Sequence, residues 1–372
     1  MTHKVYNHEK NVLQAAQERI AYVFDEFERV NVSISGGKDS TVLAVLALRE
    51  AQKRDRKVGF FFLDEEVMYQ ATIDQVEYLM SLDPAHIRRY WLQIPFNLTN
   101  SVSMDEPYVR CWNKIDKKKW MRPRSNQNIL RPNWSHETII KNPNIGLDFY
   151  DVISNWELSQ KDTAELVGLR TDECPNRYYT VTRFKGYKDK YWSTNHECGG
   201  ATFYPIYDWS FMDVWHYIAQ EGLRYHKYYD FAFKKGRPAN TMRVSSLVHE
   251  HSFKDICELP EFEPGTYQKL CERIKGISYA QETARNSKSF ACRKLPKAYK
   301  TWKEYRDFLL ATYRKPEHIP IFKKRFDKHL QNEYVFRQEC RQLICADFEN
   351  NLPVDNKPDP REQTIAKWRE IL

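Results

Sequence analysis

The stretch from Arg29 to Ser40, RVNVSISGGKDS, continues directly into the run TVLAVLALREAQ. Val30, Val32 and Ile34 alternate with polar residues as in a buried strand, and two glycines then interrupt the pattern. The run that follows carries its apolar residues at helical spacing. The stretch therefore predicts a strand, a tight glycine turn and the amino terminus of a helix, which together form an anion-binding site.

The turn supplies the first candidate nucleotide-binding residues. Gly36 and Gly37 allow the backbone to approach a phosphate closely, because neither carries a Cβ. The first helical turn adds N–H donors at the positive end of the helix dipole. Ser35 and Ser40 add hydroxyl groups, and Lys38 adds a positive charge. A glycine-rich turn that binds nothing is the alternative interpretation.

The turn does not match the Walker A loop, which requires GxxxxGK followed by Ser or Thr. Val32 occupies the position where that motif has its first glycine, and Asp39 follows Lys38 where it has a hydroxyl residue. Phosphate recognition by a Walker A loop is therefore excluded.

Length and composition favour a globular protein with a substantial core. The chain has 372 residues, of which 41% are hydrophobic, enough for one large α/β domain and a helical addition. It contains no run of eighteen apolar residues, and its first ten residues, MTHKVYNHEK, lack an apolar signal core. We therefore expect a cytoplasmic protein with no membrane partner.

Cysteine spacing and net charge constrain the partners further. The sequence has no CxxC, which indicates reduced thiols and argues against disulfides or a zinc site. The net charge of +8 favours an acidic partner or substrate such as DNA or RNA, with a solvated surface as the alternative. The eight cysteines are Cys111, Cys174, Cys198, Cys257, Cys271, Cys292, Cys340 and Cys345.

A second buried strand is expected from Lys57 to Leu63, after a helix predicted between residues 9 and 28 and the helix that follows the turn. Two strands joined by such a crossover form a right-handed βαβ unit with a parallel sheet. Asp64 and Glu65 follow the second strand, at the sheet edge where nucleotides bind in open α/β folds. We expect them to hold a ribose or a metal, and capping of a surface helix is the alternative.

After a helix expected over residues 69–82 and a strand over 89–94, the segment from Pro95 to Asn144 is predicted to be irregular. It contains the run CWNKIDKKKWMRPR, rich in aromatic and basic residues. Such residues stack on bases and hold phosphates, so we predict substrate binding here, with packed tryptophans below a basic surface as the alternative. The candidates are Cys111, Trp112, Arg122 and Arg124.

A further strand is expected from Ala164 to Arg170, followed by the polar turn TDECPNR. Arg170 and Arg177 flank Asp172 and Glu173, so the arginines can clamp phosphate oxygens while the carboxylates orient a guanidinium or a metal. Cys174 is either a nucleophile or a residue that only fills space in the turn. The absence of an identifiable histidine partner favours the second interpretation.

These motifs resemble those of a known superfamily. SGGKDS resembles the SGGxDS pyrophosphate loop (PP-loop) of the ATP pyrophosphatases, and GLRTDECPNR resembles the GxRxxES..R element of the branch named after phosphoadenosine phosphosulfate (PAPS) reductase. Cys174 stands where that branch commonly has serine. YPIYDW, which feeds the helix DVWHYI, also recurs in that branch. Residues 242–280 resemble the extension of predicted PAPS sulfurtransferases called the DUF3440 group, which includes the IbrA-like proteins.

The resemblance implies an α/β fold, with an open, mostly parallel sheet and helices on both faces like the adenine nucleotide alpha hydrolases, plus a helical C-terminal extension. We expect a PP-loop domain over residues 1–225, with the irregular insertion at about 95–144, and a mainly helical region over 226–372. ATP and Mg²⁺ would be bound, with Asp39 as the metal ligand, and cleavage at the α-phosphorus would release pyrophosphate. The implied catalytic residues are Lys38, Asp39, Arg170, Glu173 and Arg177; substrate contacts would include Asp172 and Cys174.

Two other functions are compatible with the resemblance. The first is a PAPS-dependent sulfotransferase or reductase, although the ECGxH-type tail of PAPS reductases is missing and only Glu197, Cys198, Gly199 and Gly200 resemble it. The second is a nucleotide-sensing, nucleic-acid-binding module that acts with a ParB-like protein. The cysteine spacing does not match that of the iron–sulfur relatives.

Overall fold

The computed structural model describes two compact units in the chain. Unit 1 comprises Met1–Leu98, Arg110–Leu247 and Leu259–Arg273, and unit 2 comprises Thr99–Val109, Val248–Glu258 and Ile274–Leu372. The predicted domain boundary after residue 225 stays a prediction; residues 226–247 are part of unit 1. The described residues are 10–103, 106–182, 186–197, 199–239, 242–244, 246–249, 253–278, 294–345, 347, 350, 353–361, 364 and 367–368.

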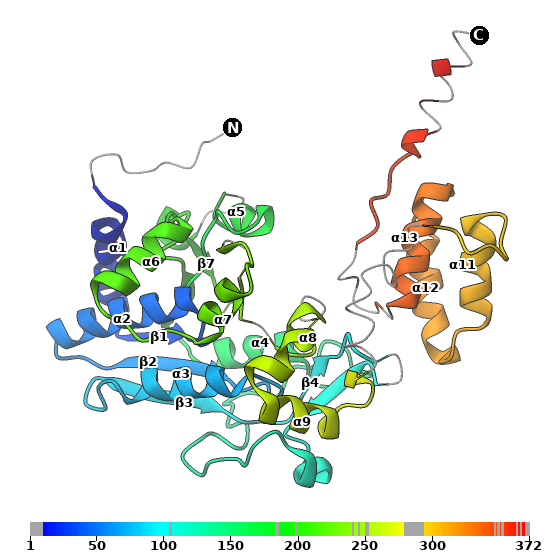
Figure 1. Cartoon of the computed structure of the whole chain (residues 1–372). Helices are drawn as coiled ribbons and strands as arrows, with labels where there is room; N and C mark the ends of the chain where they lie inside the picture. Colours follow the sequence, from blue (N-terminus) through cyan, green and yellow to red (C-terminus); the bar gives the residue numbers. More distant parts are fainter. Residues whose placement is uncertain are drawn as a thin grey trace. The chain divides into compact units, whose positions relative to one another are not determined.

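Unit 1 is built on a six-stranded sheet with the order β3-β2-β1-β6-β8-β7 (Figure 1). All neighbouring strands are parallel except β7 and β8. Val32 pairs with Phe60 on one side and with Leu166 on the other, which places β1 at the centre. The mostly parallel α/β sheet expected from the sequence is thus confirmed. The strands are β1 (Arg29–Ser33), β2 (Val58–Leu63), β3 (Ile87–Leu92), β6 (Thr163–Val167), β7 (Ser193–Asn195) and β8 (Ala201–Phe203).

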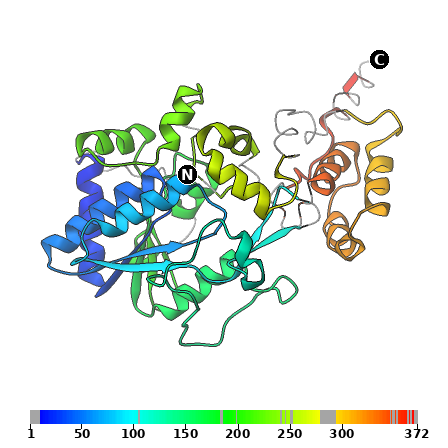
Figure 2. The same ribbon diagram turned by 60° about the horizontal axis from the view of Figure 1, so that its bottom comes forward.

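Helices cover both faces of the sheet, because both faces of its strands are apolar. The face that carries Val32 and Phe60 shares one hydrophobic core with α1 (Val12–Glu26), α2 (Lys38–Lys53), α3 (Gln70–Ser81) and α6 (Phe211–Gln220). Figure 2 shows α1 and α2 side by side, in blue. On the other face, Phe61 stacks on Trp156 of α4 (Phe149–Ser159), with ring centroids 4.5 Å apart.

The strand that leads to Arg170 is shorter than expected. It was predicted to run from Ala164 to Arg170, but β6 ends at Val167 and the chain turns, with the N–H of Leu169 donating to the carbonyl of Val167 at 2.8 Å. Gly168 allows a close approach to α2 at this turn, because a Cβ there would lie 3.1 Å from the carbonyl carbon of Asp39 and from the nitrogen of Ser40. The glycine lets the end of β6 pack directly on the first turn of α2.

The irregular segment contains more structure than the sequence indicated. β4 (Phe96–Thr99) and β5 (Tyr108–Cys111) form a two-stranded sheet, and η1 (Lys114–Lys119) is a 3₁₀ helix.

Short helical elements follow later in the chain, outside this segment. They are α5 (Pro175–Thr182), η2 (Tyr187–Asp189), α7 (Tyr228–Lys234), α8 (Phe253–Phe262) and α9 (Pro264–Arg273). The predicted helix break at Pro264 and Gly265 is confirmed, since α9 begins there.

Unit 2 confirms the expected helical C-terminal extension. Phe322 and Leu343 are among the buried residues of its small core, and Arg306 donates to Glu339 at 2.7 Å. Its helices are α11 (Trp302–Ala311), η5 (Pro316–His318), α12 (Ile319–Phe326) and α13 (Glu333–Ile344). Within the described part of the chain, we find no helix with the length and apolar character needed to span a membrane.

Candidate functional site

The glycine turn has the backbone conformation that its sequence requires. Gly36 has a φ of 75°, in the left-handed region, and a Cβ there would lie 3.1 Å from Cγ2 of Thr72. Gly37 is the N-cap of α2 and, lacking a side chain, offers no capping hydrogen bond. The amino end of α2 is therefore left without a side-chain cap from its own sequence.

The hydrogen bonds of the turn leave two backbone donors available in the first turn of α2. The N–H of Ser35 donates to Oγ of Ser40 at 3.1 Å, and the N–H of Lys38 donates to the hydroxyl of Tyr229 on α7 at 3.2 Å. Among the described residues, the N–H groups of Asp39 and Ser40 have no hydrogen-bond acceptor. Such groups at a helix amino terminus are ready donors for an anion.

Asp39 connects the turn to the end of β6. Its Oδ1 accepts from Nε of Arg170 at 2.5 Å, and its Oδ2 pairs with Nζ of Lys38 at 2.8 Å. Because both carboxylate oxygens already face cations, this arrangement does not fit the expected role of Asp39 as a magnesium ligand. It fits a positioning role, in which one carboxylate orients two cations.

Arg170 extends this network along the sheet edge. It is only 3% exposed and pairs with Asp172 at 2.6 Å and with Glu173 at 3.3 Å. Glu173 in turn pairs with Arg177 at 2.7 Å. The structure therefore brings together six of the predicted site residues through direct contacts: Lys38, Asp39, Arg170, Asp172, Glu173 and Arg177.

One cation of the site was missed by the sequence reasoning. Arg243 lies 3.8 Å from the carboxylate of Glu173, and its side chain is 51% exposed, whereas that of Arg177 is 39% exposed. The sequence signal was weak, because Arg243 lies 66 positions after Arg177, in the stretch 242–280 that was assigned to the family extension and not to the site. Both arginines have room to turn toward a bound anion.

These residues line a cleft of about 450 Å³ at the carboxyl edge of the sheet. The predicted residues Ser35, Gly37, Lys38, Asp39, Ser40, Glu65, Arg170, Glu173 and Arg177 all contribute to its wall. The volume is in the usual range for small-ligand sites. The cleft also has an apolar wall that the motifs did not indicate, made by Phe61, Phe62, Met68, Phe149 and Ile153.

Asp64 and Glu65 have different environments although they are adjacent. Glu65 lines the cleft, and burial, reinforced by the charge of Asp64, raises the pKa of its carboxyl to about 7. Asp64 is fully buried and does not line the cleft. Its Oδ2 accepts from Nε1 of Trp91 and Nε2 of Gln93, both at 2.9 Å, and its Oδ1 pairs with Arg122.

The candidates from the irregular segment do not line this cleft. Trp112 is fully buried and donates from Nε1 to the carbonyl of Asp64 at 2.7 Å, so neither face of its indole is open to a base. Cys111 is also buried, its Sγ donates to the carbonyl of Glu65 at 3.0 Å, and burial raises the pKa of its thiol. Arg122 and Arg124 instead line a separate hollow.

The remaining cysteines give no cluster or bridge in the described part of the chain. Cys174 is half-buried and does not line the cleft. Cys198 and Cys292 lie outside the described residues. No disulfide joins the described cysteines, and no group of three or more Asp, Glu, His or Cys side chains among the described residues has a metal-binding arrangement.

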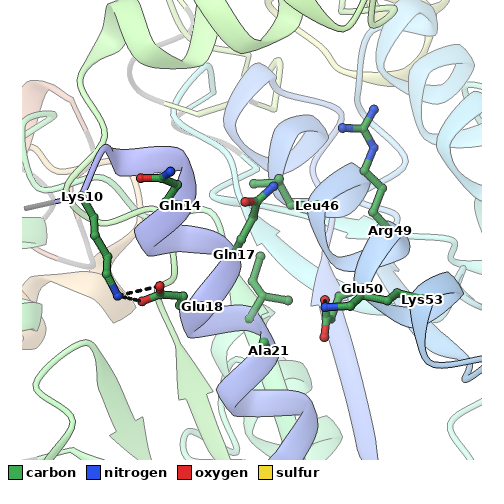
Figure 3. Close-up of a pocket in the computed structure, with 10 residues that line it drawn as sticks. Lys10, Gln14, Gln17, Glu18, Ala21, Leu46, Arg49, Glu50 and Lys53 are labelled. Atoms are coloured by element: carbon green, nitrogen blue, oxygen red, sulfur yellow. Dashed lines mark hydrogen bonds and ion pairs between the residues drawn. The ribbon is translucent and has the colours of Figure 1, made fainter.

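Another hollow, of about 670 Å³, lies between α1 and α2 and holds none of the predicted site residues (Figure 3). Lys10 forms an ion pair with Glu18 at its edge, at 2.6 Å. Arg49 forms an ion pair with Glu221 at 2.6 Å. Its charges are thus largely paired within the protein, and it lacks the glycine turn that lines the cleft.

A known protein family matches the part of the chain that forms most of the cleft. Residues 29–235, more than half of the sequence, match the family described as "Phosphoadenosine phosphosulfate reductase domain". The chain belongs to the PAPS reductase family. Residues 236–339 match a domain of unknown function, DUF3440. An uncharacterized Escherichia coli K12 protein, YbdN, is 28% identical over 369 residues, covering 97% of this chain and 86% of that protein.

Solved structures show more distant likenesses. A phosphate complex of PAPS reductase from Candida auris is 12% identical and covers 62% of this chain and 88% of its own, with a TM-score of 0.36. FMN adenylyltransferase of Candida glabrata, in complex with FMN and the ATP analogue AMPCPP, is 11% identical. The match covers 67% of this chain and 69% of that structure's chain, and the TM-score is also 0.36. The U34-tRNA thiolase NcsA of Methanococcus maripaludis, with its [4Fe-4S] cluster, is 11% identical. The match covers 78% of this chain and 85% of that structure's chain, with a TM-score of 0.32.

Proposed function

We propose that this protein is a nucleotide-dependent enzyme that binds ATP, or a PAPS-like nucleotide, in the cleft at the glycine turn. The observation that carries the proposal is the amino end of α2. Its N–H groups at Asp39 and Ser40 lack acceptors in the described chain, and Lys38 and Arg170 stand beside them. Oriented donors and cations of this kind are what a phosphate chain requires.

With ATP, the β- and γ-phosphates would occupy the turn and the α-phosphorus would face the acceptor. An acceptor nucleophile attacks the α-phosphorus, the bond to the bridging oxygen of the β-phosphate breaks, and pyrophosphate leaves with the electron pair. Lys38 and the two N–H groups would stabilise the charge that develops on pyrophosphate. The pairing of Lys38 with Asp39, at 2.8 Å, fixes the lysine before substrate arrives.

The other walls of the cleft fit the rest of a nucleotide. Phe61 and Phe149 belong to the apolar wall, which suits a purine ring. Glu65 lines the cleft with a pKa near 7, so at neutral pH it is present both as a proton donor and as an acceptor for a ribose hydroxyl. Since Asp39 does not fit a metal ligand here, we derive no step through magnesium.

Exchange of labelled pyrophosphate into ATP tests the proposal directly. We expect exchange in the presence of a competent acceptor, and a loss of about 10²–10³-fold in Lys38→Ala, the usual effect of removing one transition-state donor. Lys57→Ala is the matched control, because Lys57 is an exposed lysine just before β2, at the amino end of that strand. Unchanged exchange in Lys38→Ala would contradict the proposal.

The alternative, PAPS-dependent sulfur transfer or reduction, is favoured by the family match over residues 29–235. Arg177 and Arg243 are the half-exposed cations suited to a 3′-phosphate. This alternative requires that adenosine 3′,5′-bisphosphate binds more tightly than ATP, and that Cys198→Ser abolishes turnover. A fully active Cys198→Ser protein would remove it. Partnership with a ParB-like protein stays a prediction.

A further inference from the structure

A hollow of about 670 Å³ in unit 1 carries a concentration of positive charge that the proposed nucleotide chemistry does not use. Its lining residues come from η1, from the segment that follows η1 and from α9, which contacts η1. In the part of the chain that the structure describes, no carboxylate lines it. Its cations are Lys114, Lys117, Arg122, Arg124 and Lys269. We infer that this hollow, called here the basic pocket, binds single-stranded nucleic acid.

The two arginines of the basic pocket are held in fixed positions by protein groups. Arg122 pairs with Asp64 and donates from Nη1 to the carbonyl of Glu66 at 2.7 Å. Arg124 donates from Nη2 to the carbonyl of Trp112 at 3.2 Å, and its guanidinium carbon lies 5.0 Å from the ring centroid of Trp120. The result is a cationic and aromatic lining whose arginines are already held in place, so that binding needs little reorganisation.

Arg124 forms no ion pair with a carboxylate among the described residues, although the charges of Glu66 and Asp64 act on it from a greater distance. Its Nε is buried and, like Nε of Arg122, has no hydrogen-bond partner in the described chain. Burial also lowers the pKa of the Arg124 guanidinium. An anion brought into the pocket would relieve this unfavourable desolvation.

The lysines at the mouth of the pocket are exposed and free of ion pairs within the described chain. This holds for Lys114 and Lys117 on η1 and for Lys269 on α9. Asp116, the acidic residue of η1, lies within 3.7 Å of Arg273 and does not line the pocket. Unpaired lysines next to stacked rings and guanidinium planes match the alternation of phosphates and bases along a single strand.

An acidic polypeptide is the main competing partner, because carboxylates also pair with lysine. Arg124 lies against the ring of Trp120, and both partly buried side chains line the pocket. Bases stack on guanidinium and indole groups and acidic side chains do not, so this lining favours nucleic acid. The pocket is linked to the cleft by adjacent residues, with Asp64 holding Arg122 and Glu65 lining the cleft. A strand bound here would therefore lie on the same sheet edge as the proposed nucleotide.

The test is fluorescence anisotropy with labelled single-stranded RNA and DNA of about 20 nucleotides, without ATP, so that its outcome is independent of the proposed nucleotide chemistry. We expect salt-dependent binding by the full chain. In Lys117→Gln/Lys269→Gln, the slope of log affinity against log salt should fall by about 1.4, at about 0.7 per lost phosphate contact on a single strand, with roughly tenfold weaker binding at low salt.

The matched control is Lys57→Gln/Lys161→Gln, which removes the same charge from two exposed lysines that precede β2 and β6. The inference predicts that this variant keeps both the slope and the affinity to within about twofold. Equal losses in the two variants, or no binding at low salt, would overturn it. So would tighter binding of polyglutamate than of the oligonucleotides, or a preference for duplex.

Discussion

Two polar clusters lie at the carboxyl edge of the same sheet and differ in how their charges are used. In the cleft cluster, Lys38, Asp39, Arg170, Glu173 and Arg177 form a chain of ion pairs that ends in partly exposed arginine. In the buried cluster, formed by Asp64, Glu66, Arg122 and Arg273, both carboxylates are fully buried and each pairs with an arginine. Exposure and spare cations, more than residue type, distinguish a ligand site from a structural one.

Backbone geometry marks the buried cluster as well. Glu66 and Trp112 both have left-handed backbone, with φ of 60° and 54°, and the N–H of Trp112 donates to Oε2 of Glu66 at 2.5 Å. Such conformations persist only where the surroundings hold them in place. Here the surroundings are the ion pairs with Arg122 and Arg273, so this cluster stabilises the sheet edge that the cleft occupies.

The largest expected effect on stability is in the buried cluster. Arg273→Ala leaves the carboxylate of Glu66 buried without its 2.6 Å partner, and we expect it to lower the free energy of unfolding by about 3–5 kcal/mol. Urea denaturation measures this loss. Lys269→Ala, an exposed residue on the same helix, is the control and should change stability by less than about 0.5 kcal/mol. A loss below about 1 kcal/mol for Arg273→Ala would remove the distinction between the clusters.

In the cleft cluster, we expect a substitution to lower activity strongly and to change stability little. Lys38→Met should reduce nucleotide-dependent turnover about 10²–10³-fold, while the unfolding free energy changes by less than about 1 kcal/mol, because Asp39 keeps its contact with Arg170. Turnover and urea denaturation on the same preparation give both values. A large loss of stability with little loss of activity would place Lys38 among the structural residues.

A third buried carboxylate, Glu165, has hydrogen bonds but no cation among its described contacts. Its Oε1 accepts from Asn31 at 2.8 Å and from Trp156 at 3.0 Å, and burial raises the pKa of its carboxyl to about 7. Because the folded-state pKa exceeds the unfolded one, the stabilisation is complete below about pH 4.5 and is lost as pH rises through about 7.

Glu165→Gln keeps an acceptor oxygen and removes the titration. We expect it to raise the unfolding free energy by about 1–3 kcal/mol at pH 8 and to change it little at pH 5. Thermal unfolding of both proteins at the two pH values measures the difference. Equal effects at pH 5 and pH 8 would show that Glu165 does not titrate in this range.

The smallest expected effect is that of Cys174→Ser. Cys174 follows Glu173 in the chain but does not line the cleft, so we expect a stability change below about 0.5 kcal/mol and turnover within about twofold of the wild-type value. Stopped turnover with intact folding, judged by circular dichroism, would instead assign a chemical role to this thiol.

The local motifs allowed the sequence to predict the centre of the fold. The alternation of Val30, Val32 and Ile34 and the glycines after them predicted β1, the turn and α2, and the parallel sheet followed from the crossover. The contact of Arg170 with Asp39 agrees with the expectation that polar groups at the carboxyl ends of parallel strands meet at one edge, but this ion pair was not itself predicted.

Other parts of the site depend on contacts between residues far apart in the chain. Nothing local to Trp112 shows that its ring is buried on Asp64, or that Glu66 pairs with Arg273, 207 positions later. Tyr229 enters the cleft from a segment without a recognised motif, and Arg243 enters it from the stretch assigned to the family extension. β6 ends at Val167, and Gly168 then approaches Asp39 closely, a contact that periodicity does not encode.

Calorimetric titration of ATP into the full chain, with Lys38→Ala and Lys57→Ala as a matched pair, tests the central claim most directly. The account predicts one nucleotide site per chain, affinity at least tenfold weaker in Lys38→Ala, and wild-type affinity in Lys57→Ala, a tenfold change being about 1.4 kcal/mol. If neither ATP nor adenosine 3′,5′-bisphosphate binds to the wild-type protein, or if Lys38→Ala binds both as the wild type does, the glycine turn is not a phosphate site.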